Sequence, residues 1–327
     1  MTTGAVAGSA MTTPRRQRHG ARRFWVRRLI ELAVLLLGLT TLLFFLLRLA
    51  GDPAYVLAGQ EATAEQVDAI RVEYGLDRPL LLQYGAYLGS LLRLDFGRSL
   101  TTGEPALAAV LTVLPATLLL AVLAMAFTLI VAVPLGAWIG FAPDRRMRRW
   151  AARGVFFLQG VPAFVVGLLL VQLFSVQLAW LPSVGHGSPA NWILPVVSLA
   201  FFLVPKLTRV VAANVSEAMR EDYVRVARAS GAAPRELLYG YALPNALLAA
   251  TALIGTQFAF LLSGTVIIEY IFAWPGVGWL LVEATQTLDF PVIQAVALIV
   301  GTLVYLVNTA ADLVIVRLDP RISGADL

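Results

Sequence analysis

The sequence predicts an all-α membrane protein with six transmembrane helices and one small helical subdomain outside the membrane. Three observations predict this fold class. First, 59% of the 327 residues are hydrophobic and only 14% are charged, against about 45–50% and roughly 25% in soluble domains. Second, six apolar segments are long enough to cross a hydrocarbon core of about 30 Å. Third, positive charges gather between alternate segments, as topology signals do.

Each predicted span is a mostly apolar run of about 20 residues or more, the length that a helix needs to cross the bilayer. The runs are Leu29–Ala50, Val110–Phe141, Val155–Leu181, Trp192–Val211, Ala246–Phe272 and Pro291–Val316. The first run is too long for a signal peptide and no small-residue cleavage site follows it, so we expect a retained span. The predicted parts are a basic segment (1–28), the first span (29–50), an extracytoplasmic subdomain (51–109), a core transmembrane domain (110–316) and a tail (317–327).

Arginine placement predicts the orientation of these spans. Arg and Lys residues gather before the first span, at 145–153, at 206–235 and in the tail, whereas 182–191 and 273–290 contain none. Because short cytoplasmic loops carry an excess of positive charge, we expect both termini and the loop 213–245 in the cytoplasm, and 51–109 outside it. The N-terminal arginines directly precede a span, so they indicate topology and not a nucleic-acid-binding arm.

The predicted extracytoplasmic subdomain contains two helices. Thr63 and Gln66 have the spacing of a capping box, and Val67 and Tyr74 follow on one helical face. The stretch "DRPLLLQYGAYLGSLLRL" predicts a second amphipathic helix with Pro79 in its first turn. The subdomain either only packs on the mouth of the bundle or also meets an external partner, and the two interpretations are compatible.

The residue types exclude several chemistries. There is no cysteine, and His19 and His186 lie far apart in the sequence, so we expect no metal site. No predicted span contains a histidine, and only Asp312 offers half of an aspartyl pair, which argues against an intramembrane hydrolase. No G-x-x-x-x-G-K-S/T loop is present, since the one lysine, Lys206, follows a proline. We therefore expect a non-catalytic chain without a cofactor of its own.

The loop 213–245 interrupts the apolar pattern with polar and small residues. Apolar side chains near 3.6 spacing over 214–230 predict a helix that continues from the fourth span. Gly231 can adopt a positive φ and end this helix, and Pro234 suits the first turn of the next. Small side chains at the apex would let another surface approach, and the flanking arginines could pair with its acidic groups. The loop either docks a soluble, force-generating partner or lies on the anionic inner leaflet.

This loop resembles the EAA loop in permease subunits of binding-protein-dependent ABC importers. The motif of that family runs Glu-Ala-Ala, three residues, Gly, nine residues, Ile, one residue, Leu-Pro. The positions that match its second Ala, its Gly and its Leu-Pro are Ala227, Gly231, Leu243 and Pro244. Three positions depart from the motif, since Arg225, Val226 and Tyr241 stand where Glu, Ala and Ile are usual. The stretch "DYVRVARASG" is similar to the variant found in the dipeptide/oligopeptide/nickel permeases.

The resemblance to that family extends along nearly the whole chain. "GLDRPLLLQY" and "LDFGRSL" match the outer subdomain of its first-type permease. "IIEYIFAWPGVGWLL" and "DFPVIQAVAL" match the segment before and into the last span, and "LDPRI" matches the C-terminal signature. Several motifs in the same order are more specific than the loop alone.

The resemblance implies a type I ABC importer permease fold and a role as one half of an ATP-driven import pathway in the bacterial inner membrane. Its partners would be a second homologous permease, two ATPase subunits that carry ATP and Mg, and an extracytoplasmic solute-binding protein. Substrate would cross by alternating access. Di- and oligopeptides are the favoured substrates, with nickel chelates, glutathione or another small solute as alternatives, because specificity lies largely in the binding protein.

A gradient-driven secondary transporter is the remote alternative. Such proteins usually have more spans, with internal repeats and broken helices. No convincing repeat is present in this sequence.

The resemblance also implies two sets of site residues. By position, the ATPase-coupling residues would be Tyr223, Val224, Arg225, Val226, Ala227, Arg228, Ala229, Ser230, Gly231, Ala232, Ala233, Pro234, Arg235, Leu243 and Pro244. An extracytoplasmic re-entrant turn would contain Glu269, Trp274, Pro275, Gly276 and Gly278. The alternative for the second set is an interfacial belt of aromatic residues with ordinary turn residues.

Polar residues within apolar spans are costly and often functional. Gln159, Gln257 and Gln294 are the candidates for lining a polar route, because peptides need hydrogen-bonding surfaces. Hydrogen bonds between helices are the alternative for each. Asp312, near the inner end of the last span, is a candidate to pair with an arginine.

Overall fold

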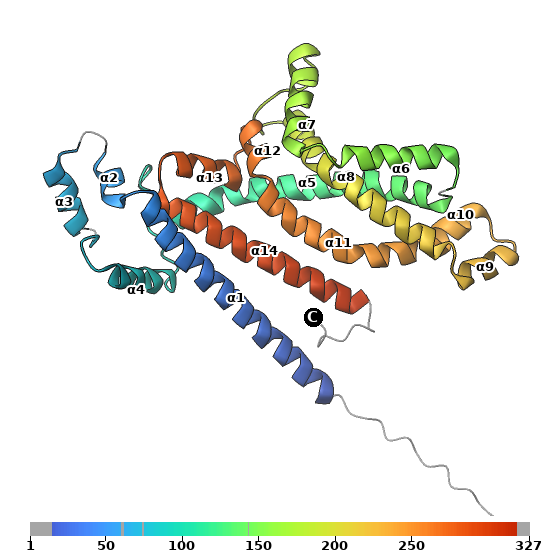
Figure 1. Ribbon diagram of the computed structural model, residues 1–327, viewed down its shortest axis with the longest axis horizontal. Helices are drawn as coiled ribbons and strands as arrows, with labels where there is room; N and C mark the ends of the chain where they lie inside the picture. The colour runs from blue at the N-terminus through green and yellow to red at the C-terminus, as the bar shows by residue number, and fades with distance from the viewer. Residues whose placement is uncertain (1–14, 60–61, 74, 143, 319–327) are drawn as a thin grey trace, which may run out of the picture.

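Long helices make up the core of the protein (Figure 1). The computed structural model describes residues 15–59, 62–73, 75–142 and 144–318. The longest helices are α1 (Arg15–Ala50), α5 (Ala106–Phe141), α8 (Pro189–Ala218), α11 (Leu243–Gly264) and α14 (Phe290–Leu318). Four helices are long and apolar enough to cross a membrane, or up to six if each of two bent pairs is one span. Over these ranges, the only strand-like contact is an isolated bridge between Arg98 and Pro105, so the predicted all-α class is confirmed.

The packing of α5 against α8 forms the centre of the bundle. A Cβ atom added to Gly136 would lie 2.8 Å from the Thr208 carbonyl oxygen, and one added to Gly140 would overlap the backbone of Ala212. Small residues therefore let the two helix backbones approach closely, as is common between membrane helices. Around this contact, the buried core includes side chains from α5, α8, α11 and α12 (Val266–Ile271), among them Leu120, Leu199, Leu261 and Ile268.

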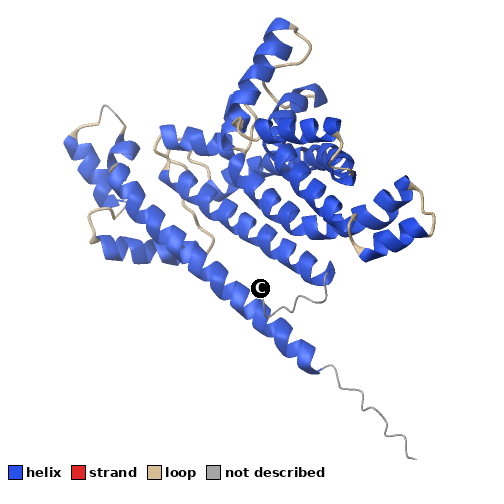
Figure 2. Ribbon diagram, turned by 45° about the vertical axis from the view of Figure 1, so that its right-hand side comes forward, coloured by secondary structure: helices blue, strands red, loops and turns tan. Residues whose placement is uncertain are grey.

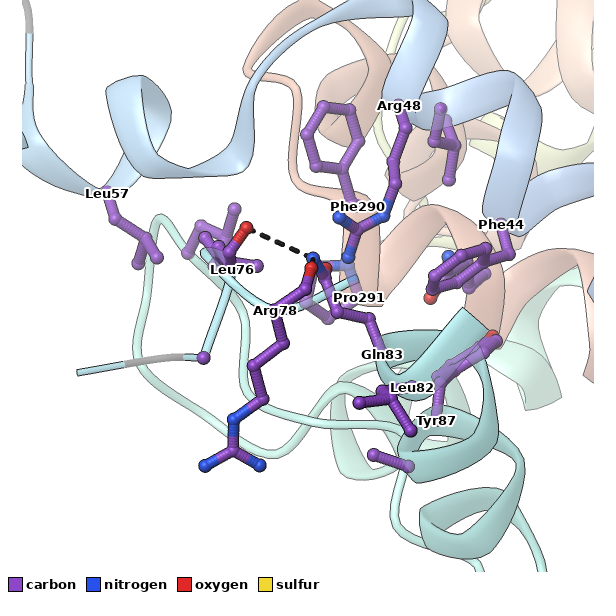
Figure 3. Close-up of a pocket in the computed structure, with 15 residues that line it drawn as sticks. Phe44, Arg48, Leu57, Leu76, Arg78, Leu82, Gln83, Tyr87, Phe290 and Pro291 are labelled. Carbon is purple, nitrogen blue, oxygen red and sulfur yellow. Dashed lines mark hydrogen bonds between the residues drawn. The ribbon is translucent and has the colours of Figure 1, made fainter. Parts of the chain in front are cut away.

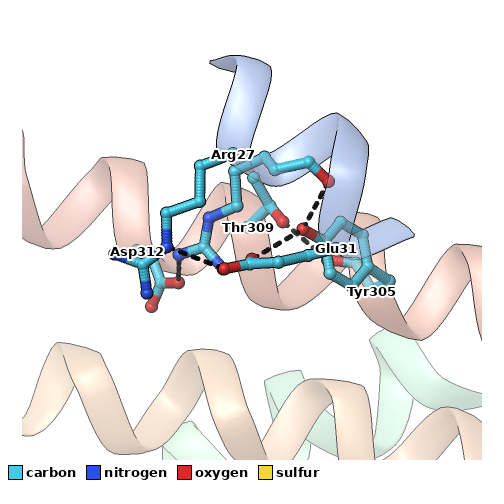
Figure 4. Close-up of polar contacts among 6 residues, drawn as sticks. Arg27, Glu31, Tyr305, Thr309 and Asp312 are labelled. Atoms are coloured by element: carbon cyan, nitrogen blue, oxygen red, sulfur yellow. Dashed lines mark hydrogen bonds and ion pairs between the residues drawn. The ribbon is translucent and has the colours of Figure 1, made fainter. Parts of the chain in front are cut away.

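Helix α1 runs alongside α14 (Figures 1 and 2) and is joined to it by a polar cluster (Figure 4). Arg28 forms ion pairs with Asp312 and, at 3.3 Å, with Glu31. The Tyr305 hydroxyl donates a hydrogen bond to the Arg28 carbonyl oxygen at 2.8 Å and lies 3.1 Å from Glu31 Oε2. Asp312 thus pairs with an arginine, as predicted, and the cluster stabilises the contact between the first and last spans.

The residues of 51–105 form a small helical unit at one end of the molecule (Figure 1). It contains α2 (Pro53–Ala58), α3 (Ala64–Glu73) and α4 (Leu80–Leu91), of which α2 was not predicted. The capping box is confirmed, because the Thr63 N–H donates to Gln66 Oε1 at 2.9 Å and the Gln66 N–H donates to Thr63 Oγ1 at 3.4 Å. Pro79 is the N-cap of α4 and so lies one residue before the predicted position in its first turn.

Two of the sequence motifs meet where this unit joins the bundle. The Ser99 hydroxyl, from "LDFGRSL", donates to the buried Asp289 carboxylate, from "DFPVIQAVAL". The other carboxylate oxygen of Asp289 accepts the Val292 N–H at 3.4 Å and thereby caps the start of α14. The contact links residues 190 positions apart in the sequence.

The predicted third span, Val155–Leu181, is wrong as a single helix. The segment contains the end of α6 (Arg146–Leu158), then α7 (Ala163–Leu170) and the π-helix η1 (Val171–Gln177). The axis of α6 and the joint axis of α7 and η1 meet at a bend of 97°. Pro162 explains the break, because proline lacks an N–H for the helical hydrogen bond and disfavours helix in the residue before it. As a result, α6 lies along the bundle while α7 projects from it (Figure 1).

The predicted fifth span and the helix predicted after the fourth are also divided. Ala246–Phe272 contains most of α11 and then α12, which is followed by α13 (Val277–Gln286). The helix expected over 214–230 is interrupted, because α8 ends at Ala218 and α9 (Asp222–Ala229) begins after a short turn. Residues 1–14, Tyr74 and the "DPRI" part of the C-terminal signature lie outside the described residues.

Candidate functional site

A helical hairpin built from residues 222–242 projects from the end of the molecule opposite α2–α4 (Figure 1). Its first arm is α9, and its second arm is α10 (Pro234–Glu236) followed by the π-helix η2 (Leu237–Ala242). Val224 and Ala227 on one face of α9 are buried against Leu237 of η2, with Met219 and Tyr241 beside them. This apolar contact gives the hairpin a small core of its own.

The turn of the hairpin is set by Gly231. This glycine has φ +88°, and its N–H donates to the Arg228 carbonyl oxygen at 3.1 Å. The Ala232 N–H donates to the Ala227 carbonyl oxygen, also at 3.1 Å. The two bonds form a Schellman motif, which needs a residue with positive φ after the helix. Pro234 is the first residue of α10, so the predicted glycine turn and the proline start are both present.

The outward face of α9 combines an apolar residue with arginines. The side chain of Val226 is 65% exposed, and Tyr223 is exposed beside it. Arg225 pairs with Asp222 at 2.5 Å, and Arg228 lies on the same exposed side of the helix. The other exposed residues of the predicted coupling set are Ala229, Ser230, Gly231, Ala233, Pro234 and Arg235. An exposed valine and tyrosine on a helix that also carries exposed arginines fit a binding surface better than a solvated face.

The second arm of the hairpin continues directly into α11. Pro244 has no N–H to donate to the Gly240 carbonyl, which favours the π-helical register of η2 just before it. The Asn245 side chain instead donates to the Tyr241 carbonyl oxygen at 2.7 Å. The Asn214 side chain, from α8, donates to the Ala246 carbonyl oxygen at 3.2 Å. Hydrogen bonds at the base of the hairpin therefore join η2 to α11, and α11 to α8.

The second predicted set of site residues forms a buried turn pinned to α5. Glu269 is fully buried, and its Oε1 accepts the Thr117 hydroxyl at 2.8 Å. Its Oε2 accepts the Gly278 N–H at 2.7 Å and the Trp279 N–H at 3.3 Å. The carboxylate thus holds the segment between α12 and α13 to the side of α5.

Close packing explains the other residue types in this turn. A Cβ atom on Gly276 would overlap the Glu269 carboxylate, and one on Gly278 would lie 2.5 Å from Val266 Cα. Trp274 is fully buried and its Nε1–H donates to the Ala116 carbonyl oxygen at 2.9 Å. Pro275 is half-buried between them. The burial of Trp274 excludes it from a lipid-facing aromatic belt, so the turn is a structural element of the core.

The three glutamines predicted to line a polar route lie in three separate places. Gln159 follows α6 in a small cavity beside Arg209. Gln257 of α11 accepts a hydrogen bond from Lys206 of α8 at 2.9 Å. Gln294 of α14 lines a larger cavity near α1 and α4. They do not form one continuous polar route within this chain.

Lys206 was predicted from the sequence only as a topology charge and as no part of an ATP-binding loop, yet it lies in the polar contact between α8 and α11. It lies near the middle of α8, and Arg209 follows it on the exposed side of the same helix. The exposed residues of α11 and α12 that share one helical face with each other are Thr256, Phe260, Ser263, Ile267 and Tyr270. Charged and polar side chains on apolar helices are rarely lipid-facing, so this surface needs a protein or aqueous neighbour. The sequence feature that could have indicated this surface is a lysine inside a predicted span.

Within the described ranges, no group of three or more His, Cys, Asp or Glu side chains could hold a metal ion.

Comparison with known proteins identifies the family. The model of the binding-protein-dependent transport system inner membrane component matches residues 132–324, and the model of the N-terminal part of such membrane components matches residues 21–121. The glutathione transport system permease protein GsiC of Escherichia coli is 35% identical over 302 residues, which cover 91% of this chain and 97% of the relative. A putative peptide transport system permease protein of Brucella abortus is 37% identical over 310 residues, which cover 91% and 98%.

Solved structures share the fold of the core. The MetNI methionine ABC transporter in an inward-facing conformation aligns with a TM-score of 0.57 at 18% identity, over 64% of this chain and 96% of that chain. An amino acid ABC transporter with histidines aligns with a TM-score of 0.50 at 18% identity, over 64% and 94%. These structures show the fold, and the two family matches with the 35–37% identical relatives show that the chain belongs to the binding-protein-dependent transport system inner membrane components.

Proposed function

We propose that this permease forms half of an ATP-driven import pathway for di- and oligopeptides in the bacterial cytoplasmic membrane. The observation that carries the proposal is the 222–242 hairpin, which presents Val226 and its arginines on a base continuous with α11. Two ATPase subunits would bind there, one on this chain and one on a homologous partner. The relatives named as glutathione and peptide permeases support peptides as the substrate class.

The proposed coupling needs two states that the ATPases stabilise differently. When the ATPases close around ATP, they would push on α9, and the contacts of η2, Asn214 and Asn245 would move α8 and α11 with it. These helices carry a mixed exposed surface, with Arg209, Thr256 and Ser263 beside apolar residues such as Phe260. That surface would face the second permease across the translocation route.

The orientation that we propose places the hairpin and both termini in the cytoplasm. The hairpin and the arginine-rich start of α6 lie together at one end of the molecule, while α2–α4 lie at the other (Figure 1). Positive charge at one end supports a cytoplasmic placement for that end. The α2–α4 unit would then face the solute-binding protein.

Co-purification tests the docking step. The tagged complex would be solubilised from its native membrane with wild-type chain, with Val226→Glu, or with Val72→Glu as the matched control. Val226 and Val72 are 65% and 67% exposed and lie on α9 and α3. We expect Val226→Glu to lower ATPase recovery by about tenfold, since an acid in an apolar contact costs about 1.4 kcal/mol or more. Equal ATPase recovery in all three samples would contradict the proposed docking site.

Uptake tests the substrate class. Proteoliposomes containing the whole complex, its binding protein and internal ATP would be given a labelled dipeptide, glutathione or a nickel chelate. We expect ATP-dependent uptake of the dipeptide. Uptake restricted to the nickel chelate would leave the importer role intact and replace the proposed substrate.

A further inference from the structure

A cavity of about 300 Å³ lies where α1, α4 and the start of α14 meet, lined in part by residues of "GLDRPLLLQY" and "DFPVIQAVAL" (Figure 3). Its walls are mostly apolar and include Phe44 of α1 and Phe290 of α14. Arg48 reaches from α1 into the cavity, beside Phe290 and Pro291 (Figure 3). The cavity therefore combines apolar walls with the half-buried Arg48 guanidinium, and the exposed Arg78 also contributes to its lining.

Arg48 has no ion-pair partner among the described residues. Its guanidinium lies over the Phe44 ring at 4.5 Å. The nearest acidic residue in the sequence, Asp52, attracts Arg48 only from beyond ion-pair distance and forms its ion pair with Arg71, at 2.7 Å. A partly buried cation without a paired anion is costly, so the cavity favours a ligand that brings a negative charge.

Two neutral polar atoms in the cavity also lack partners. Gln83 Oε1 and the Tyr87 hydroxyl are buried without a hydrogen-bond partner. The Gln83 side chain is held in place, because its Nε2 donates to the Leu76 carbonyl oxygen at 3.0 Å and to that of Arg78 at 2.6 Å. Burial raises the pKa of Tyr87 above its ordinary value, so the hydroxyl keeps its proton and is a donor. Buried polar atoms are rarely left unpaired, and the ligand should therefore both accept and donate hydrogen bonds.

Helix α4 indicates where the ligand comes from. None of its residues is buried, yet it carries leucines on its surface, and Leu81 is 77% exposed. Leu92 and Leu94, just after the helix, are 89% and 69% exposed. An exposed apolar surface of this kind is typical of a contact with a membrane or another apolar partner. The cavity borders this helix and the end of the first span, so the bilayer is its nearest source of ligand.

We propose that the cavity binds the head of one phospholipid. Its phosphate would pair with Arg48 and accept a hydrogen bond from Tyr87, while a headgroup hydroxyl or ammonium would donate to Gln83 Oε1. The acyl chains would leave along the exposed leucines of α4. The lipid would thereby hold the α2–α4 unit against α1 and α14, and Gln294, at the cavity wall, would serve this site and not the substrate route.

Lipid analysis of the purified complex tests this site. The whole complex would be extracted in detergent, washed, and its retained phospholipids identified by native mass spectrometry, for wild type, Arg48→Gln, Arg48→Lys and Tyr87→Phe. Arg93→Gln is the matched control, because Arg93 is exposed just after α4 and does not line the cavity. We expect Arg48→Gln to lower retained phospholipid by about tenfold, the loss of one charge-assisted hydrogen bond. Arg48→Lys should retain more, Tyr87→Phe should lower retention several-fold, and Arg93→Gln should match wild type.

Two outcomes would overturn the proposal. One is equal retention in wild type, Arg48→Gln and Tyr87→Phe. The other is a soluble-anion site, in which inorganic phosphate protects the delipidated complex against heat as well as phosphatidylglycerol or phosphatidylethanolamine does, and only when Arg48 is present. If Arg48→Gln fails to assemble, Tyr87→Phe removes a single hydroxyl and carries the comparison alone.

Discussion

At the residue scale, Glu269 shows how one buried side chain determines a turn. It accepts hydrogen bonds from Thr117, Gly278 and Trp279, and the neighbouring glycines leave room for it. The sequence marked Glu269 as part of a turn through its resemblance to the family. Its partner on α5 lies 152 residues away, and nothing in the periodicity of either segment indicates that contact.

Two substitutions of Glu269 should distinguish how much its side-chain volume and its hydrogen bonds each contribute to stability. Glu269→Leu leaves one hydroxyl and two backbone N–H groups without an acceptor, so we expect a loss of about 3 kcal/mol or more in the free energy of unfolding. Glu269→Gln can still accept from the N–H groups and donate to Thr117, so its effect should be much smaller. Thermal unfolding in detergent measures both. Equal destabilisation by the two variants would contradict this role.

Gly231 offers a test of the hairpin turn. Gly231→Val places a β-branched residue at φ +88°, which we expect to cost about 1–2 kcal/mol. No atom lies within 4 Å of the added Cβ, so the chain should still insert in the membrane. We expect transport to fail, because the strained turn belongs to the proposed coupling hairpin. Gly154→Val is the control, since Gly154 is equally open but lies within α6. Normal uptake by Gly231→Val would show that the hairpin does not couple ATP hydrolysis to transport.

Asp52 gives the α2–α3 contact a dependence on pH. Burial raises the pKa of Asp52, but hydrogen bonds from Arg71 and the Ala54 N–H and the positive charges of Arg71 and Arg48 together outweigh it, and the net pKa is lowered. A lowered carboxyl pKa stabilises the folded state at pH values above the unfolded pKa of about 3.9, and this stabilisation is lost as pH falls through the folded value. We expect the hydrogen-exchange protection factors of α2 and α3, corrected for the intrinsic exchange rate at each pH, to fall below about pH 4 in wild type, and Asp52→Asn to remove that change. The same pH dependence in Asp52→Asn would contradict the claim that the Asp52 carboxylate stabilises the α2–α3 contact.

At the scale of helices, sequence patterns predicted which segments are helical better than where they break. The long apolar runs of α1, α5, α8 and α14 lie close to their predicted spans. The bend before α7 was not predicted, because a continuous apolar run shows no helical periodicity whose interruption would mark a break. Pro162 was nevertheless a sequence signal for it. The turn between α8 and α9 contains neither glycine nor proline. Packing of Val224 and Ala227 on Leu237 determines it, and that contact depends on the tertiary fold.

The polar cluster between α1 and α14 tests whether charges hold two spans together. We expect a double-mutant cycle of Arg28→Met and Asp312→Leu to give a coupling energy of about 1–2 kcal/mol, because both groups are partly shielded from water. Arg225 and Asp222 form the control pair, and their side chains are 67% and 88% exposed. Exposed pairs contribute little to stability. A coupling energy between Arg28 and Asp312 no larger than that of the control pair would contradict the claim that the polar cluster holds α1 to α14.

At the scale of the whole molecule, the two ends differ in the partners that they suit. One end carries the arginine-lined hairpin, and the other carries α2–α4 with its leucine-rich surface (Figure 1). Between them, α8 and α11 expose polar residues that a single permease does not cover. The sequence predicted the hairpin and the α2–α4 unit. It could not predict that the three candidate glutamines lie apart, because side chains on different helices meet only in the folded bundle.

Site-specific cross-linking tests the central claim most directly, that the hairpin contacts the ATPases. The chain contains no cysteine, so single cysteines at Val226 and Val72 can each carry a photo-cross-linker in the native membrane. We expect the probe at position 226 to capture an ATPase subunit in an ATP-sensitive manner, and the probe at position 72 to capture none. Capture of the ATPase from position 72, or its absence at position 226 in an assembled complex, would contradict the account.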